Sequence, residues 1–217
     1  MAQLTKRMFL TRNDTTTAAK TAASITAAIS AGSGFEYIGS VAVTPTDLSV
    51  AQAIGRARTE IAKANKLNSS KFRRGAETDE RIDTEGALGE WLTANILERA
   101  AGLEVAAFVA HKAPKGEVDL ILEGKRIDVK TIGAVAGRNC NINAEQHAAK
   151  APDAYLVVHL AGVAVDGTPA VADLFVVKAA DLTVPKDDGG KWELKQGWSP
   201  YFNCYMRQQL ERLPAAA

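Results

Sequence analysis

The chain has 217 residues, of which 47% are hydrophobic and 24% are charged. This balance is typical of an ordinary globular protein, and the length suits one domain with extensions or a domain with a small partner. The formal net charge is +1. That value excludes a global basic field, so any nucleic-acid binding must depend on local basic patches.

Cysteine usage and the N-terminal composition indicate the cellular compartment. Cys140 and Cys204 are far apart and match no metal-binding spacing, which is typical of reduced thiols in a cytosolic protein. No transmembrane run is present, and polar residues interrupt the apolar positions of residues 1–30, which argues against a signal peptide. We therefore expect a cytoplasmic protein with no membrane partner.

Residues 1–34 are rich in Ala, Thr and Ser. Their pattern predicts a helix over residues 15–30, which ends at the glycine-containing stretch 31–34. Because its apolar face is almost all Ala, such a helix buries little area and is marginal alone. We expect residues 1–45 to form an N-terminal extension, in which a mobile or partner-dependent arm precedes a strand over residues 35–44.

The next segment is predicted to contain a helix and then a basic stretch. Asp47 can cap a helix over residues 48–66, whose apolar residues recur at helical spacing. The polar residues 67–82 include a short basic cluster, formed by Lys71, Arg73 and Arg74. This cluster suits a loop that binds nucleic-acid phosphates, and it equally suits a solvated linker.

A second helix is predicted over residues 85–101, with Asp83 or Thr84 as its cap and Gly102 as its end. Glu90 lies in the middle of one apolar stripe of this helix, formed with Ala87, Ala94, Leu97 and Ala101. A single carboxylate in such a stripe is costly unless it is paired or bound to a metal. The alternative is a Glu that is satisfied by a buried Arg or by the backbone.

Residues 117–131 have the pattern of a β-hairpin, with two short alternating runs around Glu123 and Gly124. A two-residue turn at this dipeptide puts Asp119 directly opposite Asp128. The alternative is a three-residue loop with Gly in a bulge, which shifts the pairing by one residue, because Glu is poor in a type I′ turn.

Strand alternation divides the side chains of this hairpin between two faces. The expected core face carries Val118, Leu120, Leu122, Ile127 and Val129. The other face carries Asp119, Ile121, Arg126, Asp128 and Lys130. Two carboxylates directly opposite each other destabilise a hairpin, so this face calls for a compensating charge. A divalent cation with Lys130 beside it would supply that charge.

The remaining pattern alternates strands and helices. The predicted elements are a strand at 103–110, a Gly/Asn-rich connection at 133–141, a helix at 144–150, a buried central strand at 155–160, a turn at 166–169, a strand at 171–178, a loop at 185–190, a short edge strand at 192–194 and a terminal helix at 203–213. This order predicts an α/β domain over residues 46–214.

A helical Glu, then Asp, then Asp-x-Lys on the next strand resembles the PD-(D/E)XK nuclease superfamily. The matching runs are Gly86 to Glu90, Glu117 to Asp119 and Ile127 to Thr131. Gly-x-x-x-Glu looks like the helix of archaeal Holliday-junction resolvases and of many phage-encoded nucleases. The resemblance covers roughly residues 84–160, and Val118 departs from it by replacing the Pro of the family name. It implies a restriction-endonuclease-like mixed β-sheet core flanked by helices, with an N-terminal helical arm.

The resemblance also implies a catalytic set, formed by Glu90, Asp119, Asp128 and Lys130. Hard carboxylate oxygens suit Mg²⁺, with Mn²⁺ as a substitute, so Asp119 and Asp128 would be the ligands, with the Val129 carbonyl nearby. Glu90 would complete or orient the cluster. Lys130 beside three acids is expected to stay charged, and to position the water or stabilise transition-state charge.

These features predict a Mg²⁺-dependent deoxyribonuclease that acts in recombination, repair or genome processing, in a bacterial or phage-infected host cell. The candidate partners are DNA, a second copy of the chain in a homodimer, and a protein docked on the arm. The alternative is a catalytically inactive relative that keeps the fold for nucleic-acid binding or a structural role, which the near-neutral charge and the arm favour. Two alternatives stay open: whether the substrate is DNA or RNA, and whether the enzyme is an endonuclease or an exonuclease.

Overall fold

The computed structural model describes residues 8–12, 14–31, 36–64, 76–97, 117–133, 144–163 and 169–182. This part of the chain contains four α-helices and a five-stranded mixed sheet. The predicted α/β class is therefore confirmed. Within the described segments, no helix combines the length and apolarity that a membrane crossing requires.

The sheet has the strand order β1-β5-β4-β3-β2. Its strands are β1 (Glu36–Ala42), β2 (Leu120–Leu122), β3 (Lys125–Ile132), β4 (Ala154–Val163) and β5 (Pro169–Lys178). Strands β3 and β4 are parallel, and the other neighbours are antiparallel. A parallel pair needs a crossover connection, and this one includes α5 (Ala144–Lys150). The predicted helix at 144–150 and the predicted central strand are both confirmed.

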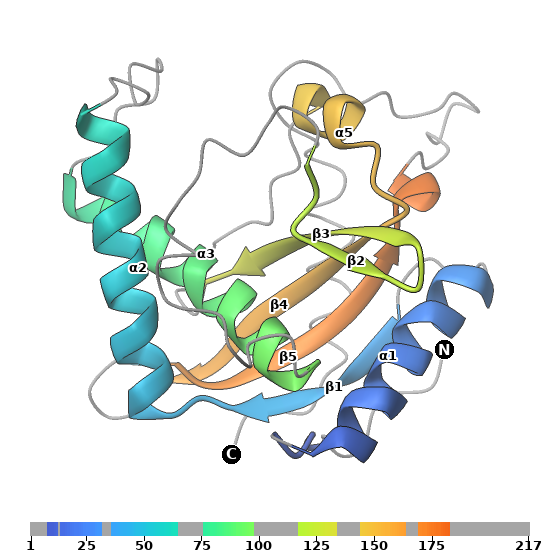
Figure 1. Cartoon of the computed structure of the whole chain (residues 1–217). Coiled ribbons are helices and arrows are strands. Elements are labelled where there is room, and N and C mark those ends of the chain that lie inside the picture. Colours follow the sequence, from blue (N-terminus) through green and yellow to red (C-terminus); the bar gives the residue numbers. More distant parts are fainter. Residues whose placement is uncertain are drawn as a thin grey trace, which may run out of the picture.

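Three helices lie on one side of the sheet, and two of them cover it directly. Helices α1 (Thr15–Ala31) and α3 (Ala76–Ile96) lie across that face, and α2 (Pro45–Ala64) packs against α3 (Figure 1). Side chains from all three helices and from every strand except β2's outer residues form one core, in which alternate residues of β4 such as Leu156 and Val158 are buried. The hairpin strand β3 adds Ile127 and Val129 to the same core, as its alternation predicted.

Helix α1 confirms the predicted helix but not its expected behaviour. Ile25 and Ile29 are buried in the common core, together with Ala28, and α1 contacts β1, β5 and α3. The two isoleucines supply the apolar area that an all-Ala face lacks. The expectation of a mobile or partner-dependent arm is therefore wrong for residues 15–31, because the sheet itself is the partner.

Helix α2 begins three residues earlier than the predicted start at residue 48. Thr44 is the N-cap, and its hydroxyl accepts a hydrogen bond from the Asp47 N–H while Asp47 Oδ2 accepts one from the Thr44 N–H at 2.7 Å. This reciprocal pair is a capping box with Pro45 in the first turn. Asp47 therefore closes the box from inside the helix, and the expectation that it caps the helix is wrong.

Helix α3 begins at Ala76, so the predicted cap at Asp83 or Thr84 is wrong. Both residues lie inside the helix, where they face α2. Asp83 Oδ2 accepts a hydrogen bond from the Thr59 hydroxyl at 2.6 Å. A Cβ added to Gly55 would lie 2.6 Å from the Thr84 Cα, so the two helices approach each other here as closely as glycine allows. Tertiary partners thus satisfy polar groups that are typical of a helix end.

Several predicted segments fall outside the described residues. These are the basic cluster Lys71, Arg73 and Arg74, the strand at 103–110, the connection and turn around 134–143 and 164–168, and all elements after residue 182.

Candidate functional site

The hairpin turn sets the register of the candidate site. Glu123 and Gly124 have φ values of 48° and 78°, the two positive angles that a type I′ turn requires. Leu122 therefore pairs with Lys125, which confirms the two-residue turn over the bulged alternative. Glu adopts the left-handed conformation here despite its cost, and the register keeps one apolar face on the core.

Asp119 is the residue directly before β2, and it lies beside the part of β3 that extends beyond the β2 pairing. Its Oδ2 accepts a hydrogen bond from the Val129 N–H at 2.8 Å. The carboxylate thus acts as the acceptor that a backbone carbonyl of a longer β2 would otherwise supply. Val129 thus contributes its N–H to the site and its side chain to the core. This bond aims the second oxygen of Asp119 toward the outer face of β3.

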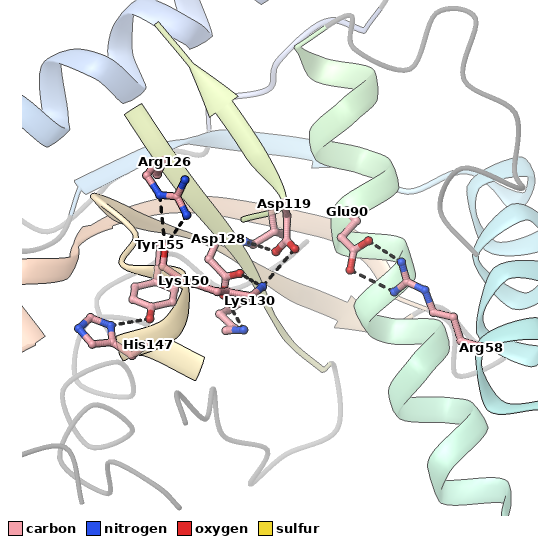
Figure 2. Close-up of polar contacts among 10 residues, drawn as sticks. Arg58, Glu90, Asp119, Arg126, Asp128, Lys130, His147, Lys150 and Tyr155 are labelled. Atoms are coloured by element: carbon pink, nitrogen blue, oxygen red, sulfur yellow. Dashed lines mark hydrogen bonds and ion pairs between the residues drawn. The ribbon is translucent and has the colours of Figure 1, made fainter. Parts of the chain in front are cut away.

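Asp128 lies on that outer face, and it is fully buried. Both of its oxygens are engaged by ammonium groups. Lys130 Nζ lies 2.6 Å from Asp128 Oδ2, and Lys150 Nζ contacts Asp128 Oδ1. Lys150 Nζ also lies 3.4 Å from Asp119 Oδ1 (Figure 2). One cation is therefore shared by two carboxylates that the hairpin brings together.

The two carboxylates differ in their electrostatics. Burial, and next the negative charge of Asp128, raise the pKa of Asp119 to about 6. Burial acts in the same direction on Asp128, but Lys130 and Lys150 outweigh it and lower the pKa of this carboxyl. Burial would lower the pKa of Lys150, whereas the two carboxylates raise it. Asp128 is thus the carboxyl that more readily stays ionised, whereas the ionised form of Asp119 is disfavoured by burial and by the negative charge of Asp128.

Glu90 reaches the neighbourhood of Asp119 from α3, as Figure 2 shows, and its charge contributes to the raised pKa of Asp119. Its carboxylate forms a bidentate pair with Arg58 of α2, at 3.1 and 2.6 Å. The pairing is the alternative that the sequence left open, a Glu satisfied by an Arg. The expected apolar stripe is confirmed for Ala87 and Leu97, which are in the core, but Glu90 and Ala94 are only half-buried. The larger core residues of α3 are Leu88, Leu92 and Ile96.

Helix α5 carries Lys150 into the site, and three contacts hold it there. The Arg126 side chain donates to the Lys150 carbonyl at 2.7 Å, and the Arg126 N–H donates to Asp153 Oδ2 at 2.8 Å. At the other side of the helix, His147 Nδ1 and the Tyr155 hydroxyl lie 2.7 Å apart, with the two rings stacked. Because Tyr155 pairs with Asp128 across the parallel strands, these contacts fix α5 beside the carboxylates.

Sequence reasoning missed Lys150 and Arg58. Lys150 comes 22 residues after Asp128, and its position depends on the parallel register that pairs Asp128 with Tyr155. No local pattern encodes that register. Arg58 follows Ile54 by one helical turn on the side of α2 that faces α3, and this spacing was the available signal. The structure therefore brings together Asp119, Asp128 and Lys130 with an unexpected Lys150, and places Glu90 and an unexpected Arg58 beside them.

The donor set was compared with what a metal ion requires. Asp119 and Asp128 offer hard oxygens to one shared cation, which is the chemistry that suits Mg²⁺. Within the described ranges, no three His, Cys, Asp or Glu side chains gather as a metal-binding group. The residues thus fit a divalent ion held by two carboxylates, with Glu90 held back by Arg58.

Comparisons of the chain with protein-family models, with curated proteins and with solved structures found no match.

Proposed function

We propose that the chain is a metal-dependent nuclease of the PD-(D/E)XK type that hydrolyses phosphodiester bonds in DNA. The observation that carries the proposal is that Asp119 and Asp128 converge on one cationic group, the ammonium of Lys150, with Lys130 on the second oxygen of Asp128. Two carboxylates that converge on a cation beside a lysine are what phosphoryl hydrolysis requires from a protein. The setting would be the cytoplasm of a bacterium or of a phage-infected host cell.

The order of elements around the pair supports the same proposal. A helix with Glu90 precedes the hairpin, and a crossover helix follows it before the parallel strand β4. This is the arrangement that a restriction-endonuclease-like core would have, with the acids of the helix and the hairpin at one edge of a mixed sheet. The helix-covered core lies on one face of the sheet, and Asp128 and Lys130 lie on the other, where their strand partners Tyr155 and Val157 are buried as well.

In this proposal Asp119 and Asp128 would hold a divalent cation, Mg²⁺ or Mn²⁺. When bound, the cation supplies neutralisation of phosphate charge and lowers the pKa of water. Lys130 would lie beside a phosphate bound at this pair, because its ammonium is already held at Asp128. It would orient the attacking water and stabilise negative charge in the transition state. Glu90 would orient the cluster from α3.

The test is a cleavage assay on plasmid and branched DNA with Mg²⁺, with and without EDTA. Wild-type protein is expected to cleave at least one substrate in Mg²⁺ only. Asp128→Asn and Lys130→Ala are expected to be inactive, and Lys125→Ala, on the same strand beside the turn, is the matched control. RNA substrates in the same series decide between DNA and RNA. Cleavage that persists in EDTA or in Asp128→Asn would contradict the proposal.

A second candidate is a catalytically inactive relative that keeps the fold for nucleic-acid binding or a structural role. It is favoured by the pairing of the acids, because Asp128 is bound to two lysines and Glu90 is bound to Arg58. Such pairing stabilises the fold without a metal. An absence of cleavage, together with binding of DNA that EDTA leaves unchanged, would favour this candidate.

A further inference from the structure

The carboxylate pair already has a cation of its own. Asp119, Asp128 and Glu90 face three basic groups, those of Lys130, Lys150 and Arg58. Each of these three carboxylates thus has at least one basic partner among the described residues. A divalent ion added without any other change would leave an excess of positive charge in a half-buried cluster, which is costly.

Lys150 is the basic group whose position conflicts with a metal ion. Among the described residues, Lys130 is paired with Asp128 and Arg58 is paired with Glu90. Lys150 Nζ lies between Asp119 and Asp128, with a contact to each, where an ion bound by both carboxylates would also lie. An ammonium and a divalent ion that use the same two oxygens exclude each other.

We infer that Lys150 is a built-in counter-ion of the Asp119–Asp128 pair, which a divalent cation must displace in order to bind. This inference rests on the proposed metal-dependent function and adds to it the residue that sets the metal affinity. The Lys150 backbone is held by Arg126, so displacement moves the flexible side chain and leaves α5 in place. Because the Lys150 side chain is 22% exposed, a displaced ammonium group can move into the adjacent solvent.

Removal of the competitor is expected to strengthen metal binding. In Lys150→Gln the two carboxylates lack their shared cation, so the melting temperature in EDTA should fall. The Mg²⁺ concentration that gives half of the maximal rise in melting temperature should fall at least about fivefold relative to wild type, a coupling of ordinary size between two bound groups. Lys125→Gln is the matched control, because Lys125 lies at the hairpin turn, and its half-saturation point should equal that of wild type.

A second measurement uses the wild-type chain and does not depend on the folding of a variant. Lysines are acetylated briefly in EDTA and in excess Mg²⁺, and each site is quantified by mass spectrometry. Lys150 is expected to be protected in EDTA and to react several-fold faster in Mg²⁺, because a displaced ammonium is accessible. Lys125 should react equally under both conditions.

The outcomes separate this inference from the proposed function. If Mg²⁺ raises the melting temperature and supports cleavage, but the half-saturation point of Lys150→Gln equals that of wild type and the reactivity of Lys150 does not change, the displacement is refuted and the metal-dependent nuclease stands. If Mg²⁺ releases Lys150 but no nucleic acid is cleaved, the displacement stands and the nuclease does not. If Mg²⁺ changes the melting temperature of neither wild type nor Lys150→Gln, both the displacement and the metal-dependent nuclease are overturned.

Discussion

Gly89 of α3 lies directly against Thr131 of β3, and a Cβ added to Gly89 would overlap the Thr131 hydroxyl. The contact lies one residue from Glu90 on the helix and one residue from Lys130 on the strand. It therefore sets how closely the helix that carries Glu90 approaches the strand that carries Asp128. Glycine is required here by the space between two elements, and not by a turn.

Gly89→Ala is expected to destabilise the protein by about 1–3 kcal/mol, because an overpacked core must shift side chains or backbone. Gly86→Ala on the same helix is the control, since its added Cβ would meet nothing within 4 Å. The control should be neutral or more stable by up to about 1 kcal/mol, from helix propensity. Urea unfolding of both variants measures the difference, and Gly89→Ala combined with Thr131→Ala should recover part of the loss. Equal stability of the two single variants would show that α3 does not press on β3.

Ile25→Ala is expected to cost about 2–5 kcal/mol of the free energy of unfolding, because Ile25 is fully buried between α1 and the sheet. Ser24→Ala, one residue earlier on the exposed side of α1, should stay within about 0.5 kcal/mol of wild type. Denaturant unfolding compares the two. A small loss for Ile25→Ala would restore the picture of a weakly held arm.

Asp47→Asn tests the contact between the N-terminal segment and α2. Asp47 is buried, and it accepts hydrogen bonds from Arg12 at 2.7 Å and from Trp91 Nε1 at 3.0 Å. Burial raises its pKa, but the Thr44 hydroxyl and Arg12 outweigh burial, and the pKa is lowered. At pH 7 the variant is expected to lose about 1.5–3 kcal/mol, the range for hydrogen bonds to a charged group.

The sign of the pH dependence follows from the lowered pKa of Asp47. A carboxyl whose folded pKa is below its ordinary value of about 3.9 stabilises the fold fully above that pH, and the stabilisation is lost as the pH falls toward the folded pKa. The melting temperatures of wild type and Asp47→Asn should therefore converge below about pH 4. A difference in melting temperature between the two proteins that stays constant from pH 7 to pH 3 would show that the Asp47 charge does not contribute to stability.

Asp128→Asn is expected to abolish cleavage and to lower the melting temperature in EDTA. Repulsion between Asp119 and Asp128 taken alone would favour the opposite, a variant that is more stable without metal. The two lysines on Asp128 reverse the sign, because its loss leaves Lys130 with a neutral partner and leaves Lys150 with Asp119 as its remaining carboxylate. Melting scans in EDTA and in Mg²⁺ measure both effects.

Lys130→Ala should lose activity but retain its stabilisation by Mg²⁺, because a lysine is not a ligand. The stabilisation of Asp128→Asn by Mg²⁺ should shrink or vanish. If Mg²⁺ shifts wild type and Asp128→Asn equally, Asp128 is not a ligand and the hairpin is only structural.

Local pattern was sufficient for most of the described elements. The hairpin at 117–131 followed from alternation and one dipeptide, and its type I′ turn formed even though Glu is poorly suited to it. The buried strand around Tyr155 followed from a continuous apolar run. Helix boundaries were less predictable. Asp47 lies inside α2, where it closes a capping box with Thr44 and also bonds Arg12 and Trp91, and Asp83 lies inside α3 and bonds Thr59 of α2.

By itself, the sequence determined that residues 117–131 form a hairpin with Asp119 and Asp128 on its two strand segments, because strand periodicity is a local property of the chain. The register that sets them opposite each other was one of two alternatives, and the turn conformation of Glu123 and Gly124 decided it. Only the tertiary structure decided which cations meet them. The parallel pairing of β3 with β4 places Lys150 beside Asp128, and the packing of α2 on α3 pairs Arg58 with Glu90. Ile25 likewise turned a weakly amphipathic helix into part of the core. In each case the deciding contact joins residues more than 20 positions apart, and register or helix packing sets it.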